Sequence, residues 1–233
     1  MFYPGKALFR SLSAAFVLAL FISHGVLAEE KPALSLEETV GLKSASSALM
    51  SPNGDAIAYL LSVPRTLYED KDGSSYRQLH VVTTEGVSRP YFSGKVSVSH
   101  VAWSPDGNSL LFTAKRDPAA DFADIYRMPL NGGEAEVIYK AKTSIKSIHP
   151  SPDGKTIAFR ASEPKPKETK QLKEKGFKAI VYEESDPLVH VWLLDVESGE
   201  AVAQDLAGSV SNVVWAPGGD SYAVAMAPTP MID

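Results

Sequence analysis

The sequence contains no cysteine among its 233 residues. Disulfides, thiolate zinc sites and thiol nucleophiles are therefore excluded, and the folded protein depends on packing and backbone hydrogen bonds. Positive charge is also scarce, because 23 Lys and Arg stand against 28 Asp and Glu. Phosphate neutralisation needs clustered basic residues, so the composition argues against nucleic acid as a partner.

The one marked apolar run lies near the N-terminus and is shorter than a bilayer requires. Lys6 and Arg10 precede this run, which covers residues 12–22, and Val26-Leu27-Ala28 follows it. These features predict a cleaved signal peptide, from Met1 to Ala28, and an exported protein that is periplasmic or secreted. Cleavage would remove 28 of the 233 residues, which leaves 205, and would change the net charge from −5 to −7. No membrane segment would remain.

A turn motif recurs four times along the chain. The copies begin at Ser51, Ser104, Ser151 and Ala216. Proline presets φ near about −65°, Asp or Asn tolerates the next position, and glycine adopts the left-handed conformation that leads into another strand. The residues that we interpret as shaping these turns, rather than as ligands or catalysts, are Pro52, Gly54, Pro105, Asp106, Gly107, Pro152, Asp153, Gly154, Pro217 and Gly219.

Short apolar strands are predicted after each motif, at residues 56–61, 109–114, 156–160 and 221–226. Alternating strands are predicted before three of the motifs, at residues 96–103, 144–148 and 210–215. Hairpins follow, with strands at residues 79–82 and 88–92, 124–130 and 136–139, and 190–196 and 201–203. A four-stranded antiparallel unit that repeats in this way is a propeller blade.

We therefore predict an all-β fold, a β-propeller of four-stranded antiparallel blades with WD-like or Tol-like repeats. The predicted partial propeller covers residues 29–233, with blade 1 at about 38–93, blade 2 at about 94–140, blade 3 at about 141–207 and a half blade at 208–233. Blade 3 contains an insertion at 162–186 whose balanced charges indicate a solvated surface, with a helical turn from Glu168 to Lys175. Propellers usually close with four to eight blades, so we expect this chain to be the amino-terminal portion of a longer protein.

Other residue types in the sequence suggest packing rather than chemistry. His80, His100, His149 and His190 lie in or beside different strands without the spacing of metal ligands. The acidic segments at residues 70–73 and 117–124 lack the spacing of a calcium loop. Trp103 and Trp215 occupy the same place before their turns, which favours packing between blades, and no pattern predicts a cofactor.

Together, these turns and four later segments resemble the N-terminal propeller of the prolyl oligopeptidase family of serine peptidases, particularly the acylaminoacyl-peptidase and dipeptidyl-peptidase branches. The segments are LKEKGF at 172–177, VYEE at 181–184, VWLLDVESGE at 191–200 and APTPMID at 227–233. In that family a hydrolase domain with the catalytic Ser, Asp and His follows the propeller, which restricts access to peptides. No Gly-x-Ser-x-Gly occurs here, so we assign no catalytic residue to this chain and expect it alone to have no peptidase activity.

The resemblance implies the non-catalytic propeller portion of an exported serine peptidase, which gates and docks peptides for a C-terminal hydrolase domain that this chain does not contain. It also implies that Glu183 and Glu184 match the glutamate pair with which dipeptidyl peptidases clamp a substrate's N-terminal ammonium. Solvated loop glutamates are the alternative. A second function also remains open, that of a periplasmic Tol-like propeller that binds protein partners as a scaffold without enzyme activity.

Overall fold

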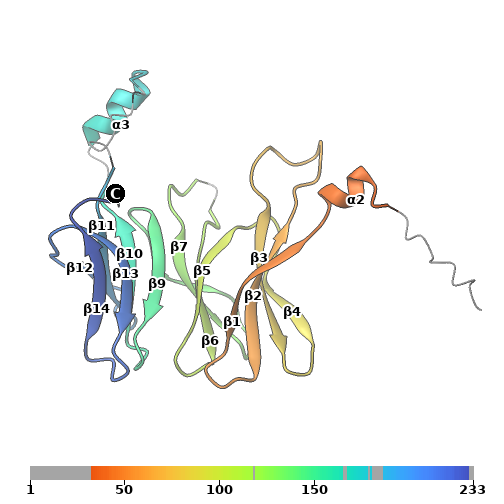
Figure 1. Ribbon diagram of the computed structural model, residues 1–233, viewed down its shortest axis with the longest axis horizontal. Helices are drawn as coiled ribbons and strands as arrows, with labels where there is room; N and C mark the ends of the chain where they lie inside the picture. The colour runs from red at the N-terminus through yellow and green to blue at the C-terminus, as the bar shows by residue number, and fades with distance from the viewer. Residues whose placement is uncertain (1–32, 118, 165–166, 178, 180–185, 231–233) are drawn as a thin grey trace, which may run out of the picture. The chain divides into compact units, whose positions relative to one another are not determined.

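The computed structural model describes residues 33–117, 119–164, 167–177, 179 and 186–230 (Figure 1). The regular secondary structure of the described chain is almost entirely β, in three four-stranded sheets and one two-stranded sheet, all antiparallel. The predicted all-β fold with four-stranded antiparallel units is thus confirmed. The predicted signal peptide at residues 1–28 lies outside the described residues.

Each sheet is one blade, and its strands pair in chain order. Blade 1 contains β1 (Ser44–Met50), β2 (Ala56–Val63), β3 (Tyr76–Thr83) and β4 (Ser88–Phe92). Blade 2 contains β5 (Val98–Trp103), β6 (Ser109–Ala114), β7 (Asp124–Pro129) and β8 (Glu136–Tyr139). Blade 3 contains β9 (Ile145–Pro150), β10 (Thr156–Ser162), β11 (Val189–Asp195) and β12 (Ala201–Ala203). The half blade contains β13 (Ser209–Trp215) and β14 (Tyr222–Ala227).

Strand β1 is not among the strands predicted from the sequence. Its residues, SASSALM, are mostly small and polar, and only Leu49 is half-buried, so the strand has no apolar alternation. Backbone pairing with β2 holds it in place. A first strand therefore precedes all four turn motifs.

Two short helices accompany the strands in the described part of the chain. The first, α2 (Leu36–Val40), begins with a capping box in which the Glu38 amide donates to Ser35 Oγ and the Ser35 amide donates to Glu38 Oε2. The second, α3 (Lys167–Glu174), lies in the insertion between β10 and β11, where a helical turn is predicted. Neither described helix has the length and hydropathy needed to cross a membrane.

The serine that begins a turn motif joins the two strands around the turn. The Ser151 hydroxyl donates to Asp153 Oδ1 at 2.6 Å and accepts from the Thr156 amide at 3.0 Å. Ser104 bonds Asp106 and Ser109 in the same way, and these serine bonds are the main cause of the lowered pKa of both Asp106 and Asp153. The sequence pattern predicts roles for proline, aspartate and glycine here, but not this serine hydrogen bond.

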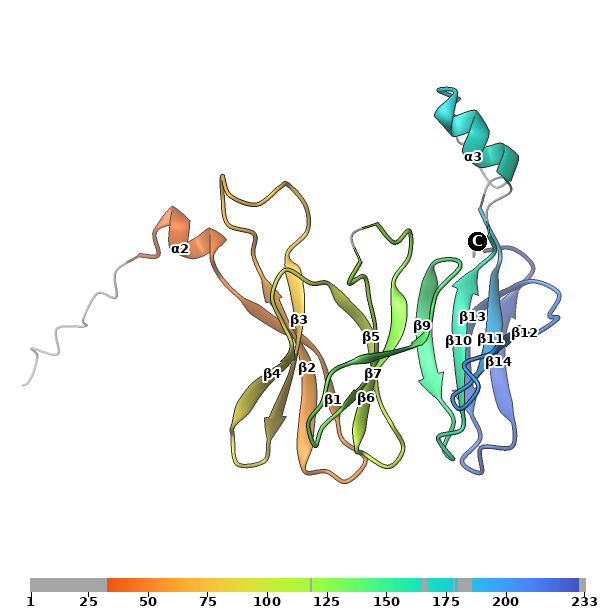
Figure 2. The same ribbon diagram turned by 180° about the vertical axis from the view of Figure 1, so that it is seen from behind.

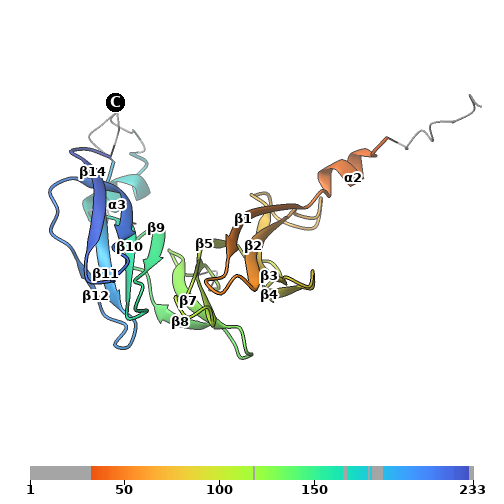
Figure 3. The ribbon, with the colours of Figure 1, turned by 60° about the horizontal axis from the view of Figure 1, so that its bottom comes forward.

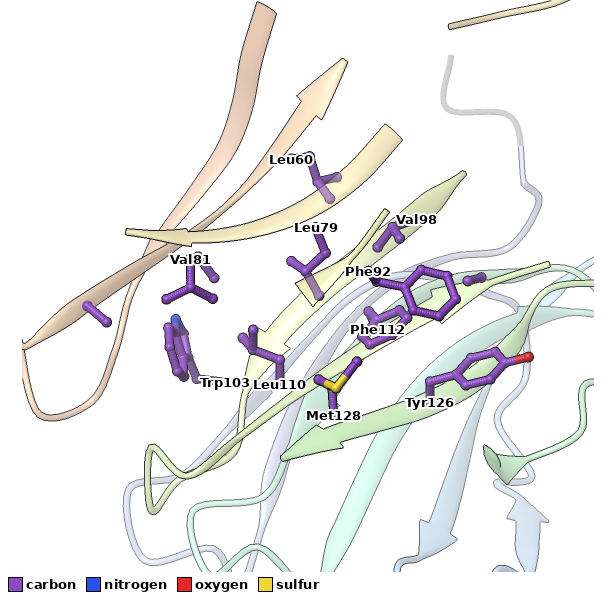
Figure 4. Packing of buried hydrophobic residues seen from close by; sticks show 13 residues of the cluster. Leu60, Leu79, Val81, Phe92, Val98, Trp103, Leu110, Phe112, Tyr126 and Met128 are labelled. Atoms are coloured by element: carbon purple, nitrogen blue, oxygen red, sulfur yellow. The ribbon is translucent and has the colours of Figure 1, made fainter. Parts of the chain in front are cut away.

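Alternate side chains of consecutive blades pack face to face. Figure 4 shows the interface between blades 1 and 2, where the Phe112 ring stacks on Tyr126 at 5.6 Å and lies 5.1 Å from Phe92. In β6, Leu110 and Phe112 belong to this interface, whereas Leu111 packs against blade 3. Both faces of this central strand are therefore buried.

The same period-2 packing continues through the later blades. Ile157 and Phe159 of β10 face blade 2, whereas Ala158 packs against Val210 and Val213 of the half blade. Blades 1, 2 and 3 follow one another in chain order in both views (Figures 1 and 2), and β13 of the half blade contacts β9, β10 and β11 of blade 3. A slip of one residue in the pairing of these strands would turn every side chain toward the opposite interface. The packing between blades therefore specifies the register.

Indole hydrogen bonds connect the first strands of neighbouring blades. Trp103 Nε1 of β5 donates to the Leu49 carbonyl of β1 at 2.9 Å, and Trp215 Nε1 of β13 donates to the His149 carbonyl of β9 at 2.9 Å. Blade 3 has Pro150 at the equivalent place, which offers no indole. Packing between blades, which the sequence predicts for these tryptophans, thus includes a directional bond.

Replacing Trp103 by Phe should lower the free energy of unfolding by about 1–3 kcal/mol, because the Leu49 carbonyl loses its buried donor. Trp192→Phe is the matched control, since Trp192 Nε1 is buried without a hydrogen-bond partner in the described part of the chain. The loss there should stay below about 1 kcal/mol, because removing an unpaired donor offsets lost packing. Urea unfolding measures both values, and equal losses would contradict the indole–carbonyl bond as a stabilising contact.

Candidate functional site

The first strand of every blade departs from regular pairing near its beginning. In β1 and β5 the irregularity contains a non-glycine residue with left-handed backbone, Ser47 at φ 53° and His100 at φ 51°. These residues occupy the same repeat position, four residues before Ser51 and Ser104. Such conformations cost roughly 1 kcal/mol or more and persist where the surroundings hold them. A bulge of this kind redirects the side chain at its centre.

The redirected side chain of His100 lies among basic groups from neighbouring strands. It is half-buried, and burial lowers its pKa below the ordinary value. The charges of Arg77, Arg160 and Lys146 lower the pKa further, whereas a hydrogen bond with the backbone of Ile145 opposes the shift. His100 therefore lies close to cationic groups from blades 1 and 3.

A second histidine, His149 of β9, belongs to the same group. Its Nε2 lies 2.9 Å from the Ser147 hydroxyl, and the side chain is half-buried. Burial lowers the pKa of His149, and Arg160 and His100 lower it further. The two histidines thus face a shared basic environment.

The Arg160 guanidinium spans the junction between blade 3 and the half blade. Its Nε donates to Ser147 Oγ at 2.8 Å, and its Nη1 donates to the Val210 carbonyl at 3.2 Å. The side chain is half-buried, and burial lowers its pKa. These two bonds hold the fork of the guanidinium in one orientation.

Arg77 occupies the corresponding junction between blades 1 and 2. Its Nη2 donates to Ser99 Oγ at 2.6 Å, and its amide donates to the Val96 carbonyl at 2.9 Å. Arg77 also forms a parallel bridge with Ser97. Residues 96 and 97 are predicted from the sequence to belong to the first strand of blade 2. They contact β3 of blade 1 instead, and β5 begins at Val98.

The loop before Arg77 is anchored by a carboxylate. Asp70 accepts hydrogen bonds from Lys95 Nζ at 2.5 Å, the Thr66 amide at 2.9 Å and the Tyr76 hydroxyl at 3.1 Å. These bonds lower the pKa of Asp70 to about 2, and the bond from Lys95 makes the largest contribution. The Arg65 guanidinium stacks on Tyr76, 4.5 Å from the ring centre. This network fixes the start of β3, and hence the backbone that carries Arg77.

We call Arg77, His100, Lys146, His149 and Arg160 the basic cluster. The first strands β1, β5, β9 and β13 lie next to one another in turn, which gathers these residues from three blades (Figure 3). The ion pairs of the described residues join Lys95 to Asp70, Arg127 to Glu136 and His190 to Glu163, and none involves the cluster. Positive charge is thus gathered, without a described carboxylate partner, in a chain of net charge −5.

The residues singled out from the sequence lie elsewhere. The ten turn residues are at the opposite end of the first strands, and Gly54, Gly107, Gly154 and Gly219 have φ between 71° and 77°. Glu183 and Glu184 lie outside the described residues. Sequence reasoning placed His100 and His149 in sheets but missed their convergence. Their positions four and two residues before a motif serine are the signal that marks both as first-strand residues.

A separate hollow of about 710 Å³ lies on blade 2. Its lining includes Asp117, Asp121 and Asp124 from the acidic segment, together with Lys140 and Lys142. Asp117 Oδ1 and Asp124 Oδ1 accept backbone hydrogen bonds, and the charges of the lining are of both signs. Among the described residues, no group of three or more His, Asp or Glu side chains is placed to hold a metal.

The fold and the repeats define a class, the β-propellers built from four-stranded antiparallel blades. No family model matches the chain. The uncharacterized peptidase YuxL of Bacillus subtilis (strain 168) is 27% identical over 132 residues, which cover 57% of this chain and 19% of that protein. The predicted resemblance to peptidases of the prolyl oligopeptidase family is confirmed by this relative and by the structural neighbours.

Two solved structures show the same fold. The acylaminoacyl peptidase of Pyrococcus horikoshii superposes with a TM-score of 0.57 at 18% identity, over 80% of this chain and 28% of its own. The AtxE2 isopeptidase superposes with a TM-score of 0.53 at 15% identity, over 75% of this chain and 32% of its own. This chain thus spans 19% of the curated relative and less than a third of either structure.

The stability of the chain should fall as pH is lowered from 7.5 to 5.5. Unfolded histidine binds a proton with a pKa of about 6.5, whereas burial and nearby cations lower the pKa of His100 and His149 in the folded chain. The unfolded state therefore binds more protons below about pH 6.5, and acidification favours it. The double variant His100→Asn, His149→Gln should lose less stability, with Asn chosen because it tolerates left-handed backbone. Urea unfolding at both pH values measures the change, and identical losses in variant and parent would contradict the burial of these imidazoles in a basic environment.

Proposed function

We propose that this chain is the non-catalytic propeller portion of an exported serine peptidase, and that it docks and gates peptides for a hydrolase domain. The supporting observation is the similarity to YuxL, a peptidase by name, together with a fold shared with acylaminoacyl peptidase. Export is proposed from the sequence of residues 1–28.

The arrangement of the blades suits such a role. The broad faces of consecutive blades are buried against each other, so the surfaces available to a peptide are loops, strand ends and the first and last strands of the blades. The basic cluster lies on the first strands β5 and β9, on β10, which pairs with β9, and at the beginning of β3. A propeller placed before a hydrolase domain would therefore offer peptides this polar surface.

The chain alone should not hydrolyse peptide p-nitroanilides, because its sequence contains no Gly-x-Ser-x-Gly nucleophile motif. The complete product of the intact gene should hydrolyse acylated or free dipeptide p-nitroanilides, and its sequence should place that motif, then Asp, then His, after the propeller. Release of p-nitroaniline measures the activity of both proteins. A gene product that contains only further blades and has no activity would overturn this proposal and favour the Tol-like scaffold.

The glutamate clamp stays a prediction, since Glu183 and Glu184 lie outside the described residues. In the complete enzyme, replacing both by Gln should lower kcat/KM for peptides with a free N-terminus by about tenfold or more, because two charge-assisted hydrogen bonds to the ammonium would be weakened. N-acetylated peptides are the matched control and should be cleaved as before. Unchanged cleavage of free peptides would instead mean that both residues are solvated loop glutamates.

A further inference from the structure

The basic cluster is electrostatically incomplete within the described chain. Arg160 is half-buried, yet its hydrogen-bond partners are a hydroxyl and a carbonyl, and no ion pair among the described residues includes it. The groups that act on the two histidines are basic side chains, the backbone of Ile145 and the Ser147 hydroxyl, with no carboxylate of the described residues among them. Partly buried positive charge without a counter-ion is unfavourable, and an anionic ligand would relieve it.

Hydrogen bonds within the protein also fix the orientation of the arginine side chains of the cluster, so these donors are preorganised for a ligand. Ser147 and the Val210 carbonyl fix the Arg160 guanidinium, and Ser99 fixes that of Arg77. The charges of both arginines act on His100, and the Ser99 hydroxyl to which Arg77 donates belongs to the residue that precedes His100 in β5. Fixed donors lose little entropy on binding, and planar guanidinium groups match the geometry of a carboxylate.

We propose that the basic cluster binds a carboxylate of a peptide, supplied either by the C-terminus or by an Asp or Glu side chain. The peptide nature of the ligand rests on the proposed function, whereas the anionic group follows from Arg77, His100, Lys146, His149 and Arg160 themselves. The cluster thereby favours peptides that present a free carboxylate to it over those that do not.

Binding should strengthen as pH falls from 7.5 to 5.5. His100 faces Arg77, Lys146 and Arg160, and His149 faces Arg160 and His100, so both imidazoles are held neutral at the higher pH. A bound carboxylate, which ionises near pH 4, favours their protonated forms. Ligand and protons therefore bind cooperatively, and we expect affinity to rise about fivefold or more. Affinity should fall as salt is added.

The test uses the purified 233-residue chain and isothermal titration calorimetry at pH 5.5 and 7.5. Two pairs of N-acetylated pentapeptides separate the sources of the carboxylate. One pair ends in a free carboxylate or an amide, and the other pair, both amidated, contains a central Glu or Gln. Tighter binding of the free acid identifies the C-terminal carboxylate, and tighter binding of the Glu peptide identifies the side chain.

Variants assign the binding to the cluster. Arg160→Gln should weaken carboxylate binding about tenfold or more, and Arg160→Lys should weaken it less, because Lys keeps the charge but loses the planar fork. Arg89→Gln is the matched control, since Arg89 is an exposed arginine of β4 outside the cluster and the same charge is removed. Thermal unfolding curves show whether each variant is folded. If Arg160→Gln is not folded, His149→Gln serves as a second variant of the cluster.

Equal binding of the neutral and carboxylate peptides would overturn the proposal. Equal losses in the Arg160 and Arg89 variants would also overturn it, because the effect would then be one of general charge. Since these measurements need no hydrolysis, they can fail while the peptidase proposal stands, and the p-nitroanilide test can fail while carboxylate binding stands.

Discussion

The burial of alternate side chains between consecutive sheets is the constraint on which the rest of the structure depends. The chain has no disulfide to hold its blades, so apolar contact between their faces must do so. The contact is visible in β6, where Leu110 and Phe112 face blade 1 while Leu111 faces blade 3. A sheet with one solvated face would not need this pattern, whereas a blade between two neighbours does.

The packing between blades also determines which residues of the first strands remain available to a ligand. Because the broad faces are used against each other, polar residues gather where the first strands of neighbouring blades meet. The indole bonds from Trp103 to Leu49 and from Trp215 to His149 fix two of these junctions at one place along the strands. The bulges that hold Ser47 and His100 lie toward the other end of the same strands. His100 thus lies at the bulged part of its strand, whereas His149 lies beside the indole bond of its own junction, so the basic cluster extends along the first strands.

The basic cluster is a local concentration of positive charge in a chain that is acidic overall. An acidic chain repels anions on average, so a local group of two arginines, a lysine and two histidines is a selective feature rather than a general property of the surface. Its members come from blades 1, 2 and 3, and each guanidinium also bonds a neighbouring blade. Loss of the register between blades would disperse the group, which links the proposed recognition of carboxylates to the packing of the sheets.

The sequence by itself determined the repeat, the turns and most strands, because proline, glycine and period-2 alternation act over a few neighbouring residues. It could not show β1, whose SASSALM residues have no apolar alternation and whose strand depends on pairing with β2. Only the tertiary structure decided which residues form the candidate site. Arg77 and Arg160 are 83 positions apart in the sequence, and both lie near His100 because three sheets pack in one register. Such proximity depends on distances between blades, which no local pattern encodes.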